Sequence, residues 1–455
     1  MSKQQTLRTR SNRFQNLPER WREERINDIA ELRMSNVDKK SDEGEKSVKL
    51  CNYVDVYYND SITSVINFME ATATEAQIER FTLRVGDVVI TKDSESPDDI
   101  GIPSVITESI ADLVCGYHLT ILRPNEEFVF GNYLFYALVS RHSAYQFYLA
   151  ANGVTRFGLT YQGTKNIRIA FPPIVEQQQI SAFLDWKTGQ IDALIAKKKE
   201  LLEKLKERRL AVITQAVTKG LNPAAPLRDS GIPWLGQVPG HWEVKRLRFA
   251  VGRIEQGWSP QCDNQPADDE AWGVMKVGCV NGDEFDSLEN KALPLDLEPM
   301  PEYELHPEDI LISRANTKEL LGSAAIVPDN VRTKLLLCDK LFRLRPATGV
   351  DAEFLTCYLR TPAARYQYER EATGSSGSMQ NIGQSTIKNL VVVLPPLDEQ
   401  KSIFQHIRST VEKLDGLMQR TETAVARLTE YRAALITAAT TGKIDVRQVV
   451  IPSLA

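Results

Sequence analysis

The sequence predicts an α+β chain in which one unit is written twice, each copy being a mixed α/β domain followed by a long helix. Three observations predict this: paired motifs at a nearly constant offset, short apolar runs broken by Gly, Pro and Asp, and two long stretches with helical spacing of apolar residues. We expect the two helices to pair antiparallel, in the manner of a coiled coil, and to separate the two mixed domains. The result is an internal pseudo-twofold repeat.

Five motifs recur in the same order along the chain. FPPIVEQ, from Phe171, matches LPPLDEQ, from Leu394, and the position numbers of Pro173 and Pro396 give the offset (396 − 173 = 223). Four further pairs lie at nearly the same offset: RVGDVVITK and HPEDILISR, LTILRP and LFRLRP, LPERW and VPGHW, and LAVIT and AALIT. Such ordered matches indicate duplication of half the chain, whereas solenoid repeats are only about 20–50 residues long.

Both mixed domains contain β-like runs that end at a Pro-Pro pair. The predicted strands are Val85–Thr91, Leu119–Leu122, Ile167–Phe171, Ile310–Ser313, Leu341–Leu344 and Leu390–Leu394. A helix is expected directly after each pair, because Pro is tolerated at a helix start and not in its interior. Glu176 and Glu399 then stand in the first turn, where a carboxylate meets the positive end of the helix dipole.

Each long helix carries a stripe of residues at heptad spacing, and the two stripes keep one offset throughout, from Leu184 and Ile407 (407 − 184 = 223) onward. We predict that the apolar members form the surface for helix pairing and subunit docking. These are Leu184, Ile191, Ile195, Leu202, Leu205 and Val212 in the first helix, and Ile407, Val411, Leu414, Met418, Val425, Leu428 and Leu435 in the second. The alternative is that each helix packs only on its own globular part. Pairing is favoured, because about 40 residues reach roughly 60 Å.

These signals divide the chain into six segments. They are an N-terminal segment (1–20), a first mixed domain (21–172), a first long helix (173–221), a linker (222–237), a second mixed domain (238–394), and a second long helix with a C-terminal tail (395–455).

The composition narrows the class of protein. The chain has 455 residues, 42% of them hydrophobic and 25% charged, as in a soluble globular protein. The sequence contains no run of 18 apolar residues, so no membrane span is expected. The N-terminus is polar, so no secretory signal is expected. Six scattered cysteines without a CxxC pair are expected to be reduced thiols in a cytoplasm. A net charge of -5 does not favour DNA binding, but it allows a local basic face or basic partner subunits.

The sequence offers no pattern for catalysis. It lacks a phosphate-binding loop, a dinucleotide fingerprint and the [ND]PP[YFW] stretch that amino-methyltransferases use, so we expect no cofactor. Cys115 and His118 are too few ligands for zinc, and a structural histidine is the simpler interpretation, so no metal is expected. The carboxylate pairs Asp98-Asp99 and Asp283-Glu284 are interpreted as solvated loops rather than catalytic groups.

Two kinds of segment could contact DNA. The first is the glycine-rich stretch before the last strand of each domain, and the second follows the GDVVITK strand and its counterpart. Their donors and acceptors suit phosphates and base edges. The candidates in these segments are Lys92, Ser94, Arg156, Tyr161, Gln162, Lys165, Arg314, Asn316, Lys318, Ser376, Gln380 and Asn381. A further candidate, Lys276, stands apart from them near the start of the second mixed domain. An ordinary loop is the alternative for each stretch. The basic cluster Lys197–Arg209 is interpreted as a solvated helix face.

The Pro-Pro-x-x-Glu-Gln junctions, the stretch DSGIPWLGQVPGHW from Asp229 and the half-chain repeat together resemble the specificity subunit of type I restriction-modification systems. The resemblance covers nearly the whole chain. It implies two target recognition domains, each of which recognises one half of a split DNA sequence, and helices that act as spacer. It also implies docking of two methyltransferase subunits, which use S-adenosylmethionine to methylate adenine. Two restriction subunits that use ATP and Mg can join and cleave DNA.

Two other functions remain open from the residues alone. One is a structural adaptor whose helix pair binds only proteins. The other is a nuclease or methyltransferase in its own right, against which the missing motifs argue.

Overall fold

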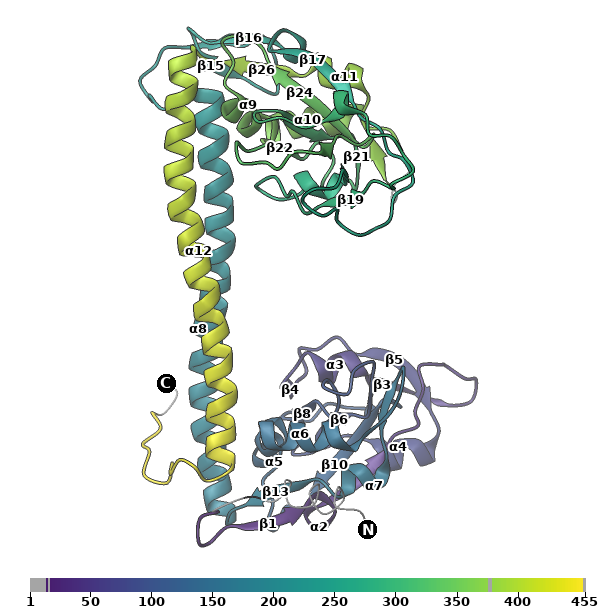
Figure 1. Cartoon of the computed structure of the whole chain (residues 1–455). Coiled ribbons are helices and arrows are strands. Elements are labelled where there is room, and N and C mark those ends of the chain that lie inside the picture. Colours follow the sequence, from purple (N-terminus) through teal and green to yellow (C-terminus); the bar gives the residue numbers. More distant parts are fainter. Residues whose placement is uncertain (1–13, 15–16, 375–378, 453–455) are drawn as a thin grey trace. The chain divides into compact units, whose positions relative to one another are not determined.

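The computed structural model describes residue 14 and residues 17–374 and 379–452. The chain divides into two compact units, Met1–Lys199 with Glu422–Ala455, and Glu200–Thr421. Each unit therefore contains one mixed domain and one half of each long helix (Figure 1). The compact units therefore do not coincide with the two sequence repeats, because the second half of α12 packs with the first mixed domain. Most of the predicted N-terminal segment, 1–20, lies outside the described residues.

The two predicted long helices are confirmed as α8 (Ile174–Lys219) and α12 (Leu397–Thr440). In the first unit they run antiparallel, because Gln179 donates to the backbone of Val446 while Asp192 pairs with Arg432. None of the predicted stripe residues is exposed. The stripes also pack on the mixed domains, so the two packing alternatives coexist. None of the helices in the described part of the chain has both the length and the apolar character that a membrane span needs.

The first mixed domain is built on a five-stranded sheet in the order β2-β10-β6-β8-β4. The strands are β2 (Ala30–Met34), β10 (Leu119–Pro124), β6 (Val88–Thr91), β8 (Pro103–Ile106) and β4 (Ser61–Ile62). Both faces of this sheet are covered, because Val88 and Ile90 join one apolar cluster and Val89 joins another. Successive residues of a strand point to opposite faces, so a strand between two clusters is apolar at every position.

Smaller sheets and helices complete this domain. The sheets are β5-β3-β9 (Met69–Ala73, Lys46–Cys51, Leu113–Cys115), β11-β12-β7 (Ala151–Gly153, Phe157–Leu159, Asp93–Ser94) and β1-β13 (Arg22–Arg25, Arg168–Phe171). The helices are α2 (Ile26–Ile29), α3 (Tyr53–Tyr57), α4 (Glu75–Phe81), α5 (Gly131–Val139), α6 (Arg141–Ala150) and α7 (Tyr161–Lys165).

The second mixed domain repeats this plan around the sheet β17-β24-β20-β22 (Val251–Gln256, Leu341–Pro346, Ile310–Ser313, Ala324–Ile326). Its other sheets are β19-β18-β23 (Asn290–Ala292, Gly273–Met275, Leu335–Leu336), β21-β25 (Ala315–Asn316, Gln380–Asn381), β16-β26 (Glu243–Arg246, Val391–Leu394) and β14-β15 (Leu227–Asp229, Gln237–Pro239). Its helices are η1 (Leu247–Phe249), η2 (Val277–Val280), η3 (Pro301–Tyr303), α9 (Ala352–Leu359), α10 (Pro362–Glu371) and α11 (Gln384–Asn389).

Three predicted strands begin too early, Ile167–Phe171 and Leu390–Leu394 by one residue and Val85–Thr91 by three. Val85–Thr91 was expected to be extended, but β6 starts at Val88, because Gly86 turns the chain with φ +89° and Asp87 accepts the N–H of Arg84. The same carboxylate is 2.6 Å from Arg123 of the LTILRP motif. In the second unit Asp309 is 2.9 Å from Arg345 of LFRLRP. Two of the repeated motifs are therefore joined by an ion pair in each copy.

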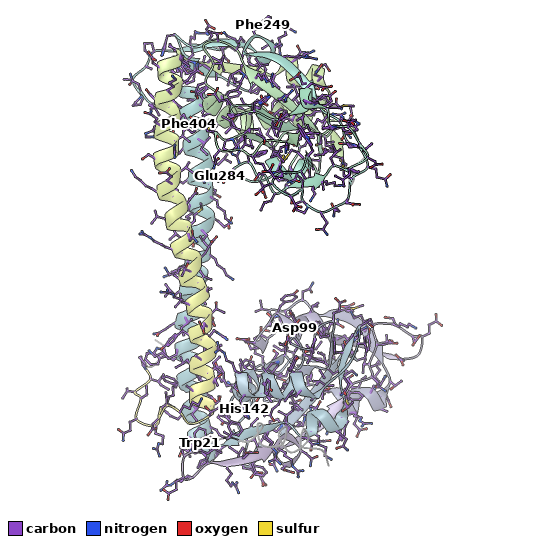
Figure 2. All side chains as sticks on the ribbon, in the orientation of Figure 1. Trp21, Asp99, His142, Phe249, Glu284 and Phe404 are labelled. Carbon is purple, nitrogen blue, oxygen red and sulfur yellow. The ribbon has the colours of Figure 1, made fainter. Side chains whose placement is uncertain are left out.

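The Glu-Gln pair after each Pro-Pro ties the helix to its domain. The buried side chain of Gln177 accepts from Phe130 N (2.9 Å) and donates to the carbonyls of Phe128 and Pro172 (2.9 Å each). The neighbouring Glu176 accepts the indole N–H of Trp21 at 2.9 Å, and Trp21 lies beside the end of α8 in Figure 2.

The second unit repeats this junction atom for atom. Gln400 accepts from Asp351 N (2.8 Å) and donates to the carbonyls of Gly349 (3.0 Å) and Pro395 (2.8 Å). Glu399 accepts the indole N–H of Trp242 at 3.1 Å. The repeated Pro-Pro-x-x-Glu-Gln sequence is therefore explained by hydrogen bonds, which the dipole argument from the sequence did not foresee.

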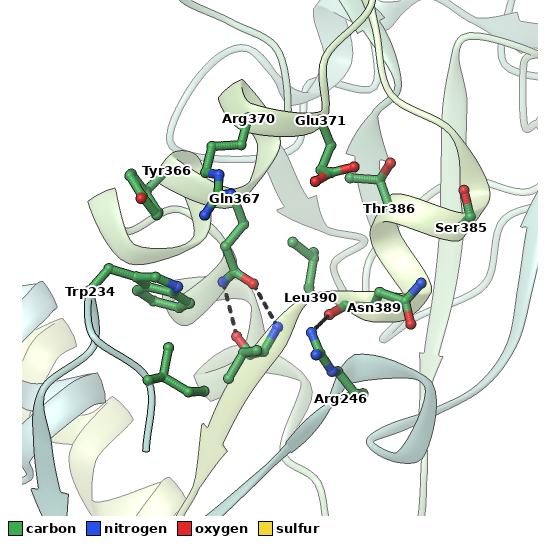
Figure 3. Close-up of a pocket in the computed structure, with 12 residues that line it drawn as sticks. Trp234, Arg246, Tyr366, Gln367, Arg370, Glu371, Ser385, Thr386, Asn389 and Leu390 are labelled. Carbon is green, nitrogen blue, oxygen red and sulfur yellow. Dashed lines mark hydrogen bonds between the residues drawn. The ribbon is translucent and has the colours of Figure 1, made fainter. Parts of the chain in front are cut away.

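A second glutamine holds the strand that leads into each junction. Gln367 of α10 accepts Val391 N at 2.7 Å and donates to Val391 O at 3.1 Å, so one amide satisfies both backbone groups of the residue (Figure 3). Gln146 of α6 does the same for Arg168 in the first unit, at 2.9 and 2.8 Å.

Replacement of the buried junction glutamine should destabilise the first mixed domain. Gln177→Ala leaves one N–H and two carbonyls without their partner, which should lower the free energy of unfolding by about 2–4 kcal/mol. Urea unfolding followed by circular dichroism and by hydrogen exchange at Phe130 measures this effect. The exposed neighbour supplies the matched control, Gln178→Ala. Equal stability of the two variants would contradict the role assigned to Gln177.

Candidate nucleic-acid interface

The two segments that the sequence singled out for DNA contact meet in one small sheet in each unit. In the first unit β7, which follows the GDVVITK strand, pairs with β12 of the glycine-rich stretch, with Ser94 opposite Phe157. In the second unit β21 pairs with β25, with Asn316 opposite Gln380. The two pairs stand at the repeat offset (316 − 94 = 222 and 380 − 157 = 223), so the two sheets are equivalent. We call each of them the platform of its unit.

Glycine is needed at the turn of each platform. Gly153 has φ +146°, and a Cβ there would lie 2.0 Å from the carbonyl oxygen of Arg156. Gly374 has φ +130°, and its Cβ would lie 2.9 Å from the carbonyl oxygen of Met379. Both backbone conformations disfavour a side chain. The candidate Ser376 lies outside the described residues.

The first platform carries an arginine, Arg156, whose side chain is held by an aspartate. Arg156 donates from Nη2 to Asp93 Oδ1 at 2.8 Å, and the other oxygen of Asp93 is 2.7 Å from His118 Nδ1. The hydrogen bond to Asp93 raises the pKa of Arg156, so the guanidinium stays charged. Its side chain is 62% exposed, and its Nη2 also lies 3.4 Å from His118 Nδ1. A guanidinium with free donors can bind a phosphate or the O6/N7 edge of guanine.

Two of the predicted contact residues, Ser94 and Asn316, are buried, and a third, Lys92, is half-buried. Lys92 donates to the carbonyl of Ser35 at 3.0 Å, and burial lowers its pKa. Ser94 is buried and accepts the N–H of Ser96 at 3.2 Å. Asn316 is only 6% exposed and donates to Asn281 at 2.8 Å. No local pattern signals this burial, because exposure depends on segments that are distant along the chain.

The other candidates differ in accessibility. Tyr161, Gln162 and Lys318 are exposed, and the ammonium of Lys165 lies 5.5 Å from the ring centre of Tyr161. The guanidinium of Arg314 lies 5.6 Å from the ring centre of Phe342 and donates to the carbonyl of Asp339. Half-buried positions are occupied by Lys276, Gln380 and Asn381. Their contact with DNA stays a prediction.

Tyrosines beside the first platform were missed. Tyr53 and Tyr57 of α3 stack at 5.4 Å, and the ring of Tyr53 meets His118 edge-on at 6.5 Å. The hydroxyl of Tyr57 donates to Asp99 at 2.7 Å, which raises the pKa of Tyr57 to about 12. Tyr58 is 76% exposed. The run YVDVYY, with aromatic residues four apart, was the available signal. Aromatic faces next to an arginine suit stacking on bases.

The acidic and thiol groups near the platforms already have structural partners. Asp99 accepts from Tyr57, and Asp283 pairs with Arg209 and Arg360, so these loops are more ordered than the solvated-loop interpretation assumed. Burial raises the pKa of the Cys115 thiol. Among residues 14, 17–374 and 379–452, no group of three or more His, Cys, Asp or Glu side chains could hold a metal ion.

The predicted helix-pairing residues fall into both units. Leu184, Ile191 and Leu435 are buried in the apolar cluster of the first unit, with Ile195 and Leu428 packed against it. Ile407 is buried in that of the second unit, with Val411 packed against it. The remaining residues are half-buried: Leu202, Leu205, Val212, Leu414, Met418 and Val425. Their part in subunit docking stays a prediction.

Residues 18–206 and 241–426 match the family described as the type I restriction modification DNA specificity domain. The chain belongs to this family. The two matched ranges each contain one platform and the junction that follows it, so the family assignment and the structural repeat coincide.

Relatives in this specificity-domain family include three type I restriction enzyme specificity subunits. EcoEI of Escherichia coli is 29% identical over 50% of this chain and 38% of its own length. EcoKI of Escherichia coli strain K12 is 24% identical over 61% of this chain and 58% of its own length. StySPI of Salmonella potsdam is 24% identical over 79% of this chain and 74% of its own length. The chain thus spans less than two thirds of the length of EcoEI and of EcoKI.

Two solved structures share the fold. A chain from a structure of complex assembly and conformational transition in a type I R-M system gives a TM-score of 0.72 at 17% identity, covering 94% of this chain and 100% of that one. The HsdS subunit from Thermoanaerobacter tengcongensis gives 0.54 at 18% identity, covering 94% and 99%. At such identities the likeness shows the specificity-subunit fold alone.

Removal of the charge on Asp93 should loosen the first platform. Asp93→Asn loses the ion pair with Arg156, and a partly exposed pair of this kind stabilises by about 0.2–1 kcal/mol. Amide hydrogen exchange in residues 151–159 should therefore become about two- to fivefold faster. The matched control is Asp98→Asn, since the Asp98 carboxylate is exposed and has no partner in the described residues. Unchanged exchange in Asp93→Asn would show that the arginine is not held by this carboxylate.

Proposed function

We propose that the chain is a non-catalytic subunit that recognises a bipartite DNA sequence, with one half-site for each mixed domain. The observation that carries this proposal is the pair of equivalent platforms with different side chains. A duplicated surface fits a target with two halves, and divergent side chains fit halves that differ in sequence. The names of the relatives, all specificity subunits of type I restriction enzymes, support it.

The proposed partners are double-stranded DNA, two methyltransferase subunits and, in the larger assembly, two restriction subunits, in the cytoplasm. S-adenosylmethionine would be used by the methyltransferase subunits for adenine-N6 methylation, and ATP and Mg by the restriction subunits for cleavage. This chain would supply recognition and no cofactor. Support comes from the type I R-M assembly among the structural neighbours.

The charge of the chain is compatible with this division of labour. Phosphate neutralisation provides much of the affinity of any DNA-binding protein, yet this chain has a net charge of -5. Its exposed cations near the platforms, such as Arg156 and Lys318, are few among the described residues. Partner subunits would therefore contribute most phosphate contacts, while this chain contributes the contacts that depend on sequence.

Exchange of one mixed domain should change one half of the target. A chain with residues 22–171 replaced by the same region of a relative, expressed with its methyltransferase subunit, should methylate a motif altered only in its first half. The reciprocal exchange of residues 243–394 is the matched control and should alter only the other half. Sequencing of methylated adenines measures both. An undivided motif, or one that neither exchange changes, would overturn the proposal.

The helix pair is proposed to set the length of the unrecognised gap between the half-sites. Four residues inserted into α8 between Asp192 and Arg209, and four into α12 between Asp415 and Arg432, preserve the ion pairs Asp192–Arg432 and Arg209–Asp415. They add about 6 Å of helix. Because each base pair of a duplex strand occupies about 3.4 Å, the gap should lengthen by about one or two base pairs. An unchanged gap in the folded double insertion would exclude this role.

A further inference from the structure

One arginine in each unit joins both long helices to the mixed domain. In the first unit Arg432 of α12 pairs through Nε with Asp192 of α8 at 2.9 Å, and through Nη2 with Asp60, in the loop between α3 and β4. Arg432 can hold both carboxylates at once, because a guanidinium donates along two different edges.

The second unit has the same three-way contact. Arg209 of α8 donates from Nε to Asp415 of α12 at 3.0 Å, and from Nη2 to Asp283, after η2, at 2.7 Å. The arginines, the helix carboxylates and the domain carboxylates all share one offset (432 − 209 = 415 − 192 = 283 − 60 = 223). The domain carboxylates stand in unrelated surroundings, YNDS and NGDE, so their agreement is not a by-product of similar sequence around them.

The contact lies far from the other attachment of the domain. Each helix is fixed to its domain at the glutamine junction in its first turn, and α8 and α12 begin at Ile174 and Leu397. The helix carboxylates Asp192 and Asp415 follow five helical turns later, which is about 27 Å along the helix. Between these two points, α8 also contacts the first domain through Ile191 in the apolar cluster and through Asp185, which accepts from Tyr136 at 2.7 Å. The arginine adds an attachment beyond these contacts, at the loop before β4, and without it that edge of the domain would lose its tie to the helix pair.

Apolar packing reaches the helix pair at Ile191, Ile195 and Leu428, but the loop before β4 faces the pair across an open hollow. Asp60, Asp192 and Arg432 line this hollow of 490 Å³. The hollow is also lined by Tyr58, Asn59, Ser61, Ile195, Lys199 and Thr429. The ion pairs therefore join the loop to the helices where the packing is open, and the side chain of Arg432 is itself only 19% exposed.

We propose that Arg432 and Arg209 are positioning residues that lock each mixed domain at one angle on the helix pair, so that a single gap length between the half-sites is accepted. This inference rests on the proposed recognition of a bipartite target. The arginines touch no base. They act through the domain that they hold.

The lock can be measured without DNA. Fluorophores on unnatural amino acids at Val65, which is exposed in the first mixed domain, and Ala193, exposed on α8, report the distance between domain and helix. The native chain should give one narrow distribution. Asp60→Asn and Arg432→Gln should each broaden it, and the double variant should add little to Arg432→Gln, since Arg432→Gln already removes the pair with Asp60.

The control is Glu79→Gln, which removes an exposed carboxylate of the same domain that has no partner among the described residues. Circular dichroism verifies that each variant is folded, and Asp60→Asn removes a charge from an exposed loop, so it should fold. A distribution as narrow in Asp60→Asn as in Glu79→Gln would overturn the lock.

The consequence for recognition is measured in the assembled system. The assembly that contains Asp60→Asn should methylate the same two half-sites as the native assembly. Its preference for the native gap over gaps one base pair longer or shorter should fall about fivefold, as expected for loss of one partly exposed ion pair. Broadened distances with undiminished gap preference would refute the link to specificity. If the native assembly methylates no bipartite motif, the proposed function fails, while the distance measurement still decides whether the lock exists.

Discussion

The hydrogen bonds of Gln177 and Gln400 are the constraint on which the rest of this structure depends. Each glutamine forms hydrogen bonds with three backbone groups at the point where a mixed domain is followed by one of the two long helices. These groups belong to the loop before α5 or α9 and to the second residue before the helix, and a buried backbone group without a partner would be costly. By satisfying them with one amide from its first turn, each helix is tied to its domain and starts in a fixed direction. The proposed lock at Arg432 and Arg209 acts about five helical turns from that fixed point, where it limits movement of the domain about the junction.

The repeated motifs turn out to be one another's partners. RVGDVVITK meets LTILRP through Asp87 and Arg123, and LPERW meets the Pro-Pro-x-x-Glu-Gln junction through Trp21 and Glu176. The same pairings recur in the second unit through Asp309 and Trp242. A duplicated chain preserves both members of a buried polar pair, because loss of either leaves the other unsatisfied. Motif pairs at a constant offset therefore marked the scaffold and said little about the surface that we propose to contact DNA.

This division explains what the sequence predicted well. The long helices, the strand Ile310–Ser313 and the inward stripes follow from periodicity and from Pro-Pro breaks, which are local. The platforms were found as segments, but not as sheets, since pairing of Ser94 with Phe157 is non-local. Lys92 and Asn316 were predicted to face DNA because their chemistry suits it, yet each binds a distant group, Ser35 or Asn281. The sequence singled out Arg209 only as the end of a basic cluster interpreted as a solvated face, and did not single out Arg432, because their acidic partners lie on other segments.

The difference between a shared scaffold and divergent surface side chains suits independent recognition of the two proposed half-sites. The Asp93–His118–Arg156 cluster of the first platform has no counterpart, because the equivalent positions hold Ala315, Lys340 and Met379. The backbone pairing beneath it is nonetheless retained in the second unit. A platform that is fixed by backbone hydrogen bonds and turn glycines depends mainly on its backbone, and displayed pairs such as Arg156–Asp93 add only a small stabilisation. Its display can therefore change in one unit without disturbing the junction, the lock or the other unit, which is the property that a modular recognition subunit requires.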